Sequence, residues 1–133
     1  MSPCTSDIAV GSLAILLWAT GADRPALCAA PFMYASAARA LDLEVEVHFA
    51  AASIELLLPG AADAIHPGRA RSRPLSAFMR DAHEAGARFL GCSAAMHERG
   101  LGAADLIAEF DGVVGATAFV ARSVDPAWRT LVF

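Results

Sequence analysis

The chain has 133 residues and a mass of 13.8 kDa, which is the size of one domain. Apolar residues make up 56% of it, which excludes a disordered chain and favours self-association. All ten basic residues are arginine, and the net charge is −4, so a nucleic-acid partner is not expected. The lack of lysine also excludes a Walker A loop and Schiff-base chemistry.

The three cysteines indicate a reduced protein. Cys4, Cys28 and Cys92 share no short spacing, and an odd, sparse count does not describe a secreted disulfide framework. The first residues carry no positive charge, and the apolar run 8–20 is shorter than the ~20 residues that span a bilayer. We therefore expect a cytoplasmic protein with no membrane partner, no cofactor and no metal site.

The first third of the chain predicts a strand, a helix and a second strand. Residues 14–19 are continuously apolar, which is typical of a strand buried on both faces of a parallel sheet. Residues 24–41 predict a helix with a kink or a broken first turn at Pro31. Residues 43–49 alternate with period two and predict a second strand, whose polar face is expected to be less deeply covered.

The rest of the chain repeats this alternation. A short helix at 53–58, capped by Ser53, and a loop at 61–73 follow the second strand. The later predicted elements are a helix between Pro74 and Gly86, a strand at 88–92, a helix at 93–99, a helix at 103–110, a strand at 112–115, a helix at 116–123 and a strand at 128–133. This order predicts a three-layer α/β/α sandwich with a mostly parallel sheet of about five strands. We expect one domain over residues 1–133, with 1–7 disordered.

Cys92 is the first candidate functional residue. Parallel sheets bind ligands at the carboxyl ends of their strands, and Cys92 ends the third predicted strand. A helix is predicted to begin directly after it, and the free N–H groups there favour a thiolate, the reactive form of cysteine. The alternative is that Cys92 is an inert, buried cysteine.

His48 and Cys28 are the candidate neighbours of Cys92. His48 ends the second predicted strand, and a histidine beside a thiol can accept its proton or stabilise the thiolate. Cys28 lies early in the helix after the first strand and is a candidate second thiol at the same edge. A purely structural role is the alternative for His48.

The motifs around Cys92 resemble a known family. Residues 84–96 read Glu-Ala-Gly-Ala-Arg-Phe-Leu-Gly-Cys-Ser-Ala-Ala-Met, and Gly-Leu at 100–101 and Asp-Leu-Ile at 105–107 follow. Their order and spacing, with the strand-like segments 40–49 and 112–119, resemble the DsrE/DsrF-like superfamily of sulfur-relay proteins. The resemblance implies a three-layer α/β fold, a homotrimer or hexamer, and Cys92 as the cysteine that accepts sulfur or carries a persulfide. It also implies sulfur donor and acceptor proteins as partners.

Three functions remain open from the sequence. The first is a persulfide carrier that accepts and passes on sulfane sulfur through Cys92. The second is a non-catalytic, oligomeric small-ligand-binding or scaffold protein. The third is a thiol-redox protein that uses Cys92 and Cys28. The apolar stretches 53–59 and 116–124 are the candidate interfaces between subunits.

Overall fold

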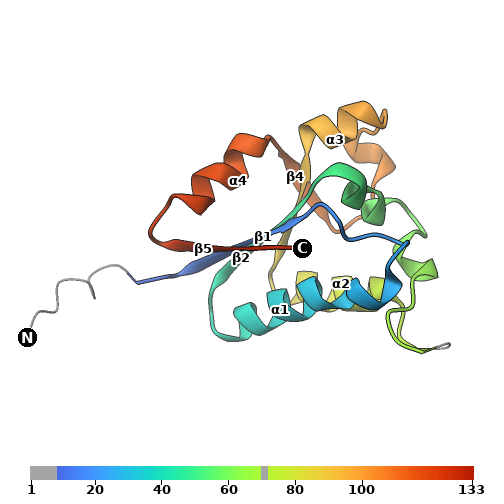
Figure 1. Ribbon diagram of the computed structural model, residues 1–133, viewed down its shortest axis with the longest axis horizontal. Coiled ribbons are helices and arrows are strands. Elements are labelled where there is room, and N and C mark those ends of the chain that lie inside the picture. Colours follow the sequence, from blue (N-terminus) through green and yellow to red (C-terminus); the bar gives the residue numbers. More distant parts are fainter. Residues whose placement is uncertain (1–8, 70–71) are drawn as a thin grey trace, which may run out of the picture.

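Within residues 9–69 and 72–133, which the computed structural model describes, five strands form one sheet in the order β4-β3-β2-β1-β5 (Figure 1). The strands are β1 (Ser12–Leu17), β2 (Glu44–Phe49), β3 (Arg88–Cys92), β4 (Phe110–Val114) and β5 (Trp128–Val132). Every pairing between neighbours is parallel, which confirms the predicted α/β fold. Cys4 and the expected disorder of residues 1–7 lie outside the described residues.

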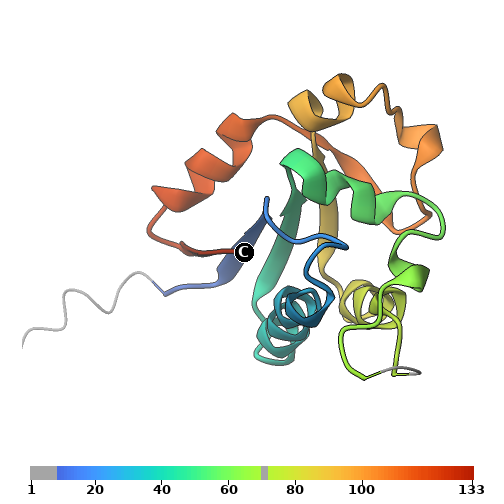
Figure 2. The same cartoon turned by 45° about the vertical axis from the view of Figure 1, so that its right-hand side comes forward.

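Helices cover both faces of the sheet (Figures 1 and 2). Helices α1 (Ala29–Ala40) and α2 (Leu75–Glu84) lie side by side on one face, and α4 (Ala116–Ser123) lies on the other. Helix α3 (Ser93–Glu98) follows β3 directly at the carboxyl end of the sheet. In the described part of the chain, no helix is long and apolar enough to cross a membrane.

The main core lies between the sheet and the face covered by α1 and α2. Phe32 of α1, Phe49 of β2 and Phe89 of β3 are fully buried there, with ring centroids 5.3 to 6.0 Å apart. Each such side chain contributes about 1.5–3 kcal/mol by leaving water. The core therefore joins β2 and β3 to α1 through aromatic contacts.

The predicted helix 24–41 is divided in the structure. A 3-10 helix occupies Pro25–Leu27, and α1 begins only at Ala29. Pro31 thus lies in the first turn of α1, where a missing N–H removes no intrahelical hydrogen bond. The broken first turn that the proline predicted is confirmed.

The predicted helix 103–110 is wrong. Only a 3-10 helix at Ala103–Asp105 forms, and the chain then extends into β4. The N–H of Ile107 donates to the carbonyl of Leu57 at 2.9 Å. This long-range hydrogen bond takes the backbone out of the helical path, and the local pattern contains no sign of it.

The segment after β2 also differs from its prediction. It forms a 3-10 helix over Ala51–Leu57, and Ser53 lies inside it rather than at its cap. The Ser53 hydroxyl instead donates to the Thr20 carbonyl at 2.7 Å and accepts from the Thr20 N–H at 3.0 Å, which ties this segment to the chain after β1. Its apolar side chains, Ile54, Leu56 and Leu57, are buried in the chain's own core, so they offer little surface to another subunit.

Candidate functional site

Cys92 and His48 line one apolar cavity at the carboxyl ends of the central strands. The cavity has a volume of about 200 Å³ and opens between the sheet and the beginning of α4. The other lining residues are Leu16, Ala50, Val114, Gly115, Ala116, Phe119 and Val120. The structure thus brings together two of the three residues that the sequence singled out, at the edge where parallel sheets bind ligands.

Strand register explains why these two side chains share a face. Side chains alternate along a strand, so Glu46 and His48 point to the same side of β2. His48 pairs with Leu90 of β3, which places Leu90 and Cys92 on that side as well. Cys92 pairs in turn with Val114 of β4, another residue of the cavity wall. This side of the sheet is the one that α4 covers.

Cys92 ends β3 and occupies the N-cap position of α3, as predicted from the sequence. Its side chain is half-buried and free of any disulfide, so the sulfur is accessible through the cavity. Among the described residues, the thiol makes no capping hydrogen bond to α3. Contact with the helix N–H groups, which the sequence suggested, is therefore absent in this conformation.

His48 is almost completely buried, with 3% of its surface exposed. Its Nε2 lies 3.0 Å from Oε1 of Glu46, and its ring meets the Phe119 ring edge-on at 5.4 Å. Burial lowers the pKa of His48, and the hydrogen bond to Glu46 opposes this shift without overcoming it. The imidazole is therefore neutral at neutral pH, with Nε2–H donating to the carboxylate. No described residue hydrogen-bonds the other nitrogen, Nδ1.

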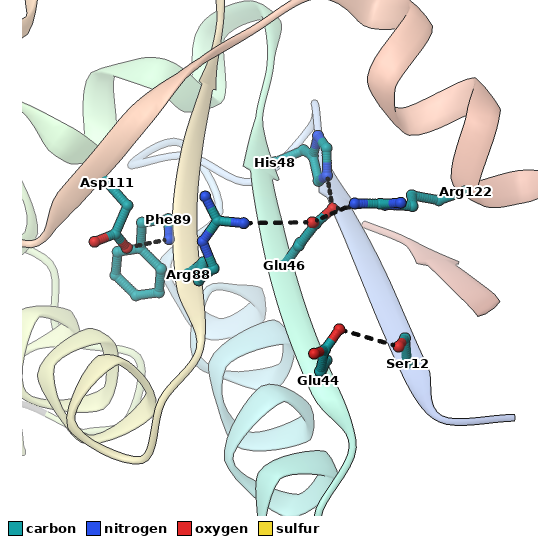
Figure 3. A network of polar contacts seen from close by, with 8 residues as sticks. All are labelled: Ser12, Glu44, Glu46, His48, Arg88, Phe89, Asp111 and Arg122. Carbon is teal, nitrogen blue, oxygen red and sulfur yellow. Dashed lines mark hydrogen bonds and ion pairs between the residues drawn. The ribbon is translucent and has the colours of Figure 1, made fainter. Parts of the chain in front are cut away.

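Beneath His48, the buried Glu46 carboxylate forms an ion pair with Arg122, whose side chain is 35% exposed (Figure 3). This pair was not predicted from the sequence. Arg122 of α4 donates from Nε to Oε1 at 3.1 Å and from Nη2 to Oε2 at 2.8 Å. Burial alone would raise the pKa of Glu46, but the hydrogen bonds from Arg122 and His48 bring it below its usual value. The hydrogen bond to Glu46 raises the pKa of Arg122 in turn.

This pair corrects the expectation that the polar face of β2 is less deeply covered. Glu46 and His48 are buried on that face, and only Glu44, nearer the start of the strand, remains exposed. The Glu-x-Glu-x-His alternation was the visible signal. Its partner lies 76 residues away along the chain, so sequence spacing could not identify it.

Cys28 lies in the core and does not line the cavity. Its thiol is fully buried and donates to the carbonyls of Gly21 at 3.2 Å and Arg24 at 3.4 Å. Burial raises the pKa of Cys28; the nearby Asp23 adds to this, and the hydrogen bond to Gly21 only partly offsets it. The structure therefore does not place Cys28 beside Cys92.

Comparisons with known proteins agree with this architecture. A solved structure, that of the protein of unknown function MTH1491 from Methanobacterium thermoautotrophicum, is similar to this chain with a TM-score of 0.60 and 17% identity. The match covers 92% of this chain and 98% of that one, and it shows a shared fold. Among curated proteins, no match was found. The model of the DsrE/DsrF-like family matches residues 14–133, and the chain belongs to that family.

Proposed function

We propose that this protein is a sulfur-relay carrier, which accepts a sulfane sulfur on Cys92 and passes it on from a persulfide. The main support for this proposal is that Cys92 and a neutral, buried His48 line one apolar cavity at the carboxyl edge of the sheet. Membership of the DsrE/DsrF-like family supports the same function. Such a carrier suits a reducing compartment, and we propose the cytoplasm.

The transfer follows from ordinary thiol chemistry. His48 accepts the Cys92 proton at Nδ1, and the thiolate attacks the outer sulfur of a donor persulfide, R–S–SH. A new S–S bond forms on Cys92 while the bond between the two donor sulfurs breaks. The electron pair leaves on the donor sulfur, which takes up the proton as R–SH. The acceptor thiolate then attacks the outer sulfur on Cys92 and reverses the sequence.

The cavity limits what can approach Cys92. Its volume of about 200 Å³ is below the ~300–1,000 Å³ of sites that enclose a whole small molecule. Apart from His48 and Cys92, its walls are apolar and offer no cation to an anionic donor. We infer that donors and acceptors insert only a terminal thiol or persulfide, while their bodies remain outside.

Assembly into a homotrimer or hexamer belongs to this proposal. Helix α4 has no fully buried residue; Val120 on the helix is 57% exposed, and Val124, which caps its C-terminus, is 78% exposed. Apolar surface of this kind marks interaction sites. Of the two stretches considered from the sequence, 116–124 is thus the one that presents apolar side chains to a neighbouring subunit. A monomer in light scattering across micromolar concentrations would contradict this.

A matched pair of cysteine variants tests the carrier function. The protein is incubated with glutathione persulfide, desalted and weighed by intact mass spectrometry. Wild type and Cys28→Ser are expected to gain the mass of one sulfur atom, and Cys92→Ser none. Serine at position 28 can still donate to the carbonyls of Gly21 and Arg24, so this control keeps the fold.

Three outcomes would contradict the proposal. Undiminished loading of Cys92→Ser would show that another group carries the sulfur. Failure of the folded wild type to load from any persulfide would favour the non-catalytic ligand-binding or scaffold function instead. Loss of loading in Cys28→Ser as well as in Cys92→Ser would favour the two-thiol redox function.

A further inference from the structure

We infer that Glu46 is a positioning residue for His48: it holds the Nε2–H of the imidazole and thereby leaves Nδ1 as the proton acceptor at the cavity of Cys92. This inference rests on the proposed role of Cys92. It extends the site to the ion pair beneath the cavity. This ion pair does not itself contact a sulfur donor.

The Glu46 carboxylate is fixed from three elements of the fold (Figure 3). Its Oε1 accepts from His48 of the same strand at 3.0 Å and from Arg122 of α4 at 3.1 Å. Its Oε2 accepts from Arg122 at 2.8 Å and lies 3.7 Å from Arg88 of β3. A carboxylate held at both oxygens cannot turn away from the imidazole, so its acceptor stays directed at Nε2.

Burial keeps the His48 imidazole neutral, and the nearby arginines Arg122 and Arg88 act in the same direction. Glu46 carries the negative charge, and Arg122 with its bidentate contact neutralises it, so the site does not require a cationic histidine. The groups that face His48 are Glu46 on its own strand, Arg88 on β3, Arg122 on α4 and Cys92 at the cavity wall. Strand β1 contributes the apolar Leu16 there.

The tautomer decides whether His48 can act as a base. In neutral imidazole one nitrogen carries the proton and the other has the lone pair. The Glu46 carboxylate can only accept, so it selects the form protonated at Nε2. Phe119 packs against the ring edge-on, which limits its rotation. Without the carboxylate, the Nδ1–H tautomer is no longer disfavoured, and this form cannot take the Cys92 proton.

Glu46→Gln tests the inference, with Glu44→Gln as its matched control. Both residues belong to β2 and point to the same face, but Glu44 is exposed, and its side chain hydrogen-bonds one residue in the described part of the chain, Ser12, at 3.5 Å. We expect Glu46→Gln to slow sulfur loading of Cys92 by roughly tenfold or more, within the range that general bases contribute. Glu44→Gln should load at the wild-type rate.

Alkylation by iodoacetamide separates this inference from the proposed function, since it needs a Cys92 thiolate but no sulfur transfer. The pH profile of Cys92 alkylation is expected to shift in Glu46→Gln and not in Glu44→Gln. Identical profiles in wild type and Glu46→Gln would overturn the positioning role, whether or not the protein carries sulfur. Absence of sulfur loading with a shifted alkylation profile would refute the carrier function alone.

Nitrogen NMR of the wild-type histidines keeps the test independent of variant folding. Coupling patterns of the His48 ring report which nitrogen carries the proton. We expect the Nε2–H tautomer at neutral pH, and in Glu46→Gln a His48 titration at lower pH, because the carboxylate raises the pKa of His48. An Nδ1–H tautomer in the wild type would refute the inference directly.

Discussion

Gly91 lies beside Cys92 at a point where the core has no room for a methyl group. A Cβ at this position would come within 2.9 Å of the Phe110 ring, 3.0 Å of Ile54 Cδ1 and 3.2 Å of Met96 Sδ. These side chains belong to three different segments, and Ile54 and Met96 are buried, so they have little space to move. We expect Gly91→Ala to lower the free energy of unfolding by about 1–3 kcal/mol, the usual cost of overpacking.

Gly112→Ala on the neighbouring strand β4 is the control. There the added Cβ would meet only Leu90 Cδ2, at 4.0 Å. Both substitutions reduce the entropy of the unfolded chain by a similar amount, so their difference isolates the steric term. Urea unfolding followed by circular dichroism measures it. Equal unfolding midpoints for the two variants would show that the Ile54 and Met96 side chains can move aside at no cost, and would refute the packing argument.

Four further predictions concern polar groups of the fold. The fold lowers the pKa of His48, so the unfolded chain binds a proton at this residue below about pH 6.5 while the folded chain does not. We therefore expect the free energy of unfolding, measured by urea titration, to fall as the pH drops from that value through the folded pKa of His48. Glu46 has a lowered pKa too, so a second loss is expected below about pH 4.3 in wild type and Glu44→Gln but not in Glu46→Gln. Cys28 should resist iodoacetamide in the native protein and react only with denaturant present, because it is buried and burial raises its pKa; native labelling as fast as that of Cys92 would contradict this. Asp111→Ala removes the carboxylate that accepts from the Phe89 N–H at 2.7 Å and from His83 at 3.0 Å. We expect it to lower the free energy of unfolding by roughly 1–2 kcal/mol, measured by thermal unfolding. An unchanged melting temperature would show that water replaces the carboxylate.

The sheet was predictable because each strand has a recognisable local pattern of apolar residues. Strand β3 occupies Arg88–Cys92 and α4 occupies Ala116–Ser123, both as predicted. Strand β1 begins at Ser12, two residues before its predicted start, and ends at Leu17. It ends there because the N–H groups of Trp18 and Ala19 both turn to the Phe133 carbonyl. Boundaries of this kind depend on partners that are distant in the sequence.

The site was predictable only in part, because some of its contacts join residues that are distant in the sequence. Cys92 and His48 could be placed together because parallel strands end at one edge of a sheet. The role of Arg122 could not, since it depends on how α4 lies across β1 and β5. Cys28 shows the opposite error. Its position early in the helical segment suggested the same edge, but the apolar surroundings that bury it are a tertiary feature.

The Glu46–Arg122 pair is hard to explain by stability. Burying the Glu46 carboxylate costs several kcal/mol of desolvation, and an apolar residue in such a position is often neutral or stabilising. Strand β2 carries Val45 and Val47 on its opposite face, so a valine at position 46 would suit the strand equally well. A carboxylate there can accept a hydrogen bond from Nε2 of His48, which a valine cannot, and His48 lines the same cavity as Cys92. The face of the sheet under α1 and α2 thus holds the main hydrophobic core, whereas the face under α4 holds the carboxylate that we infer positions the His48 proton.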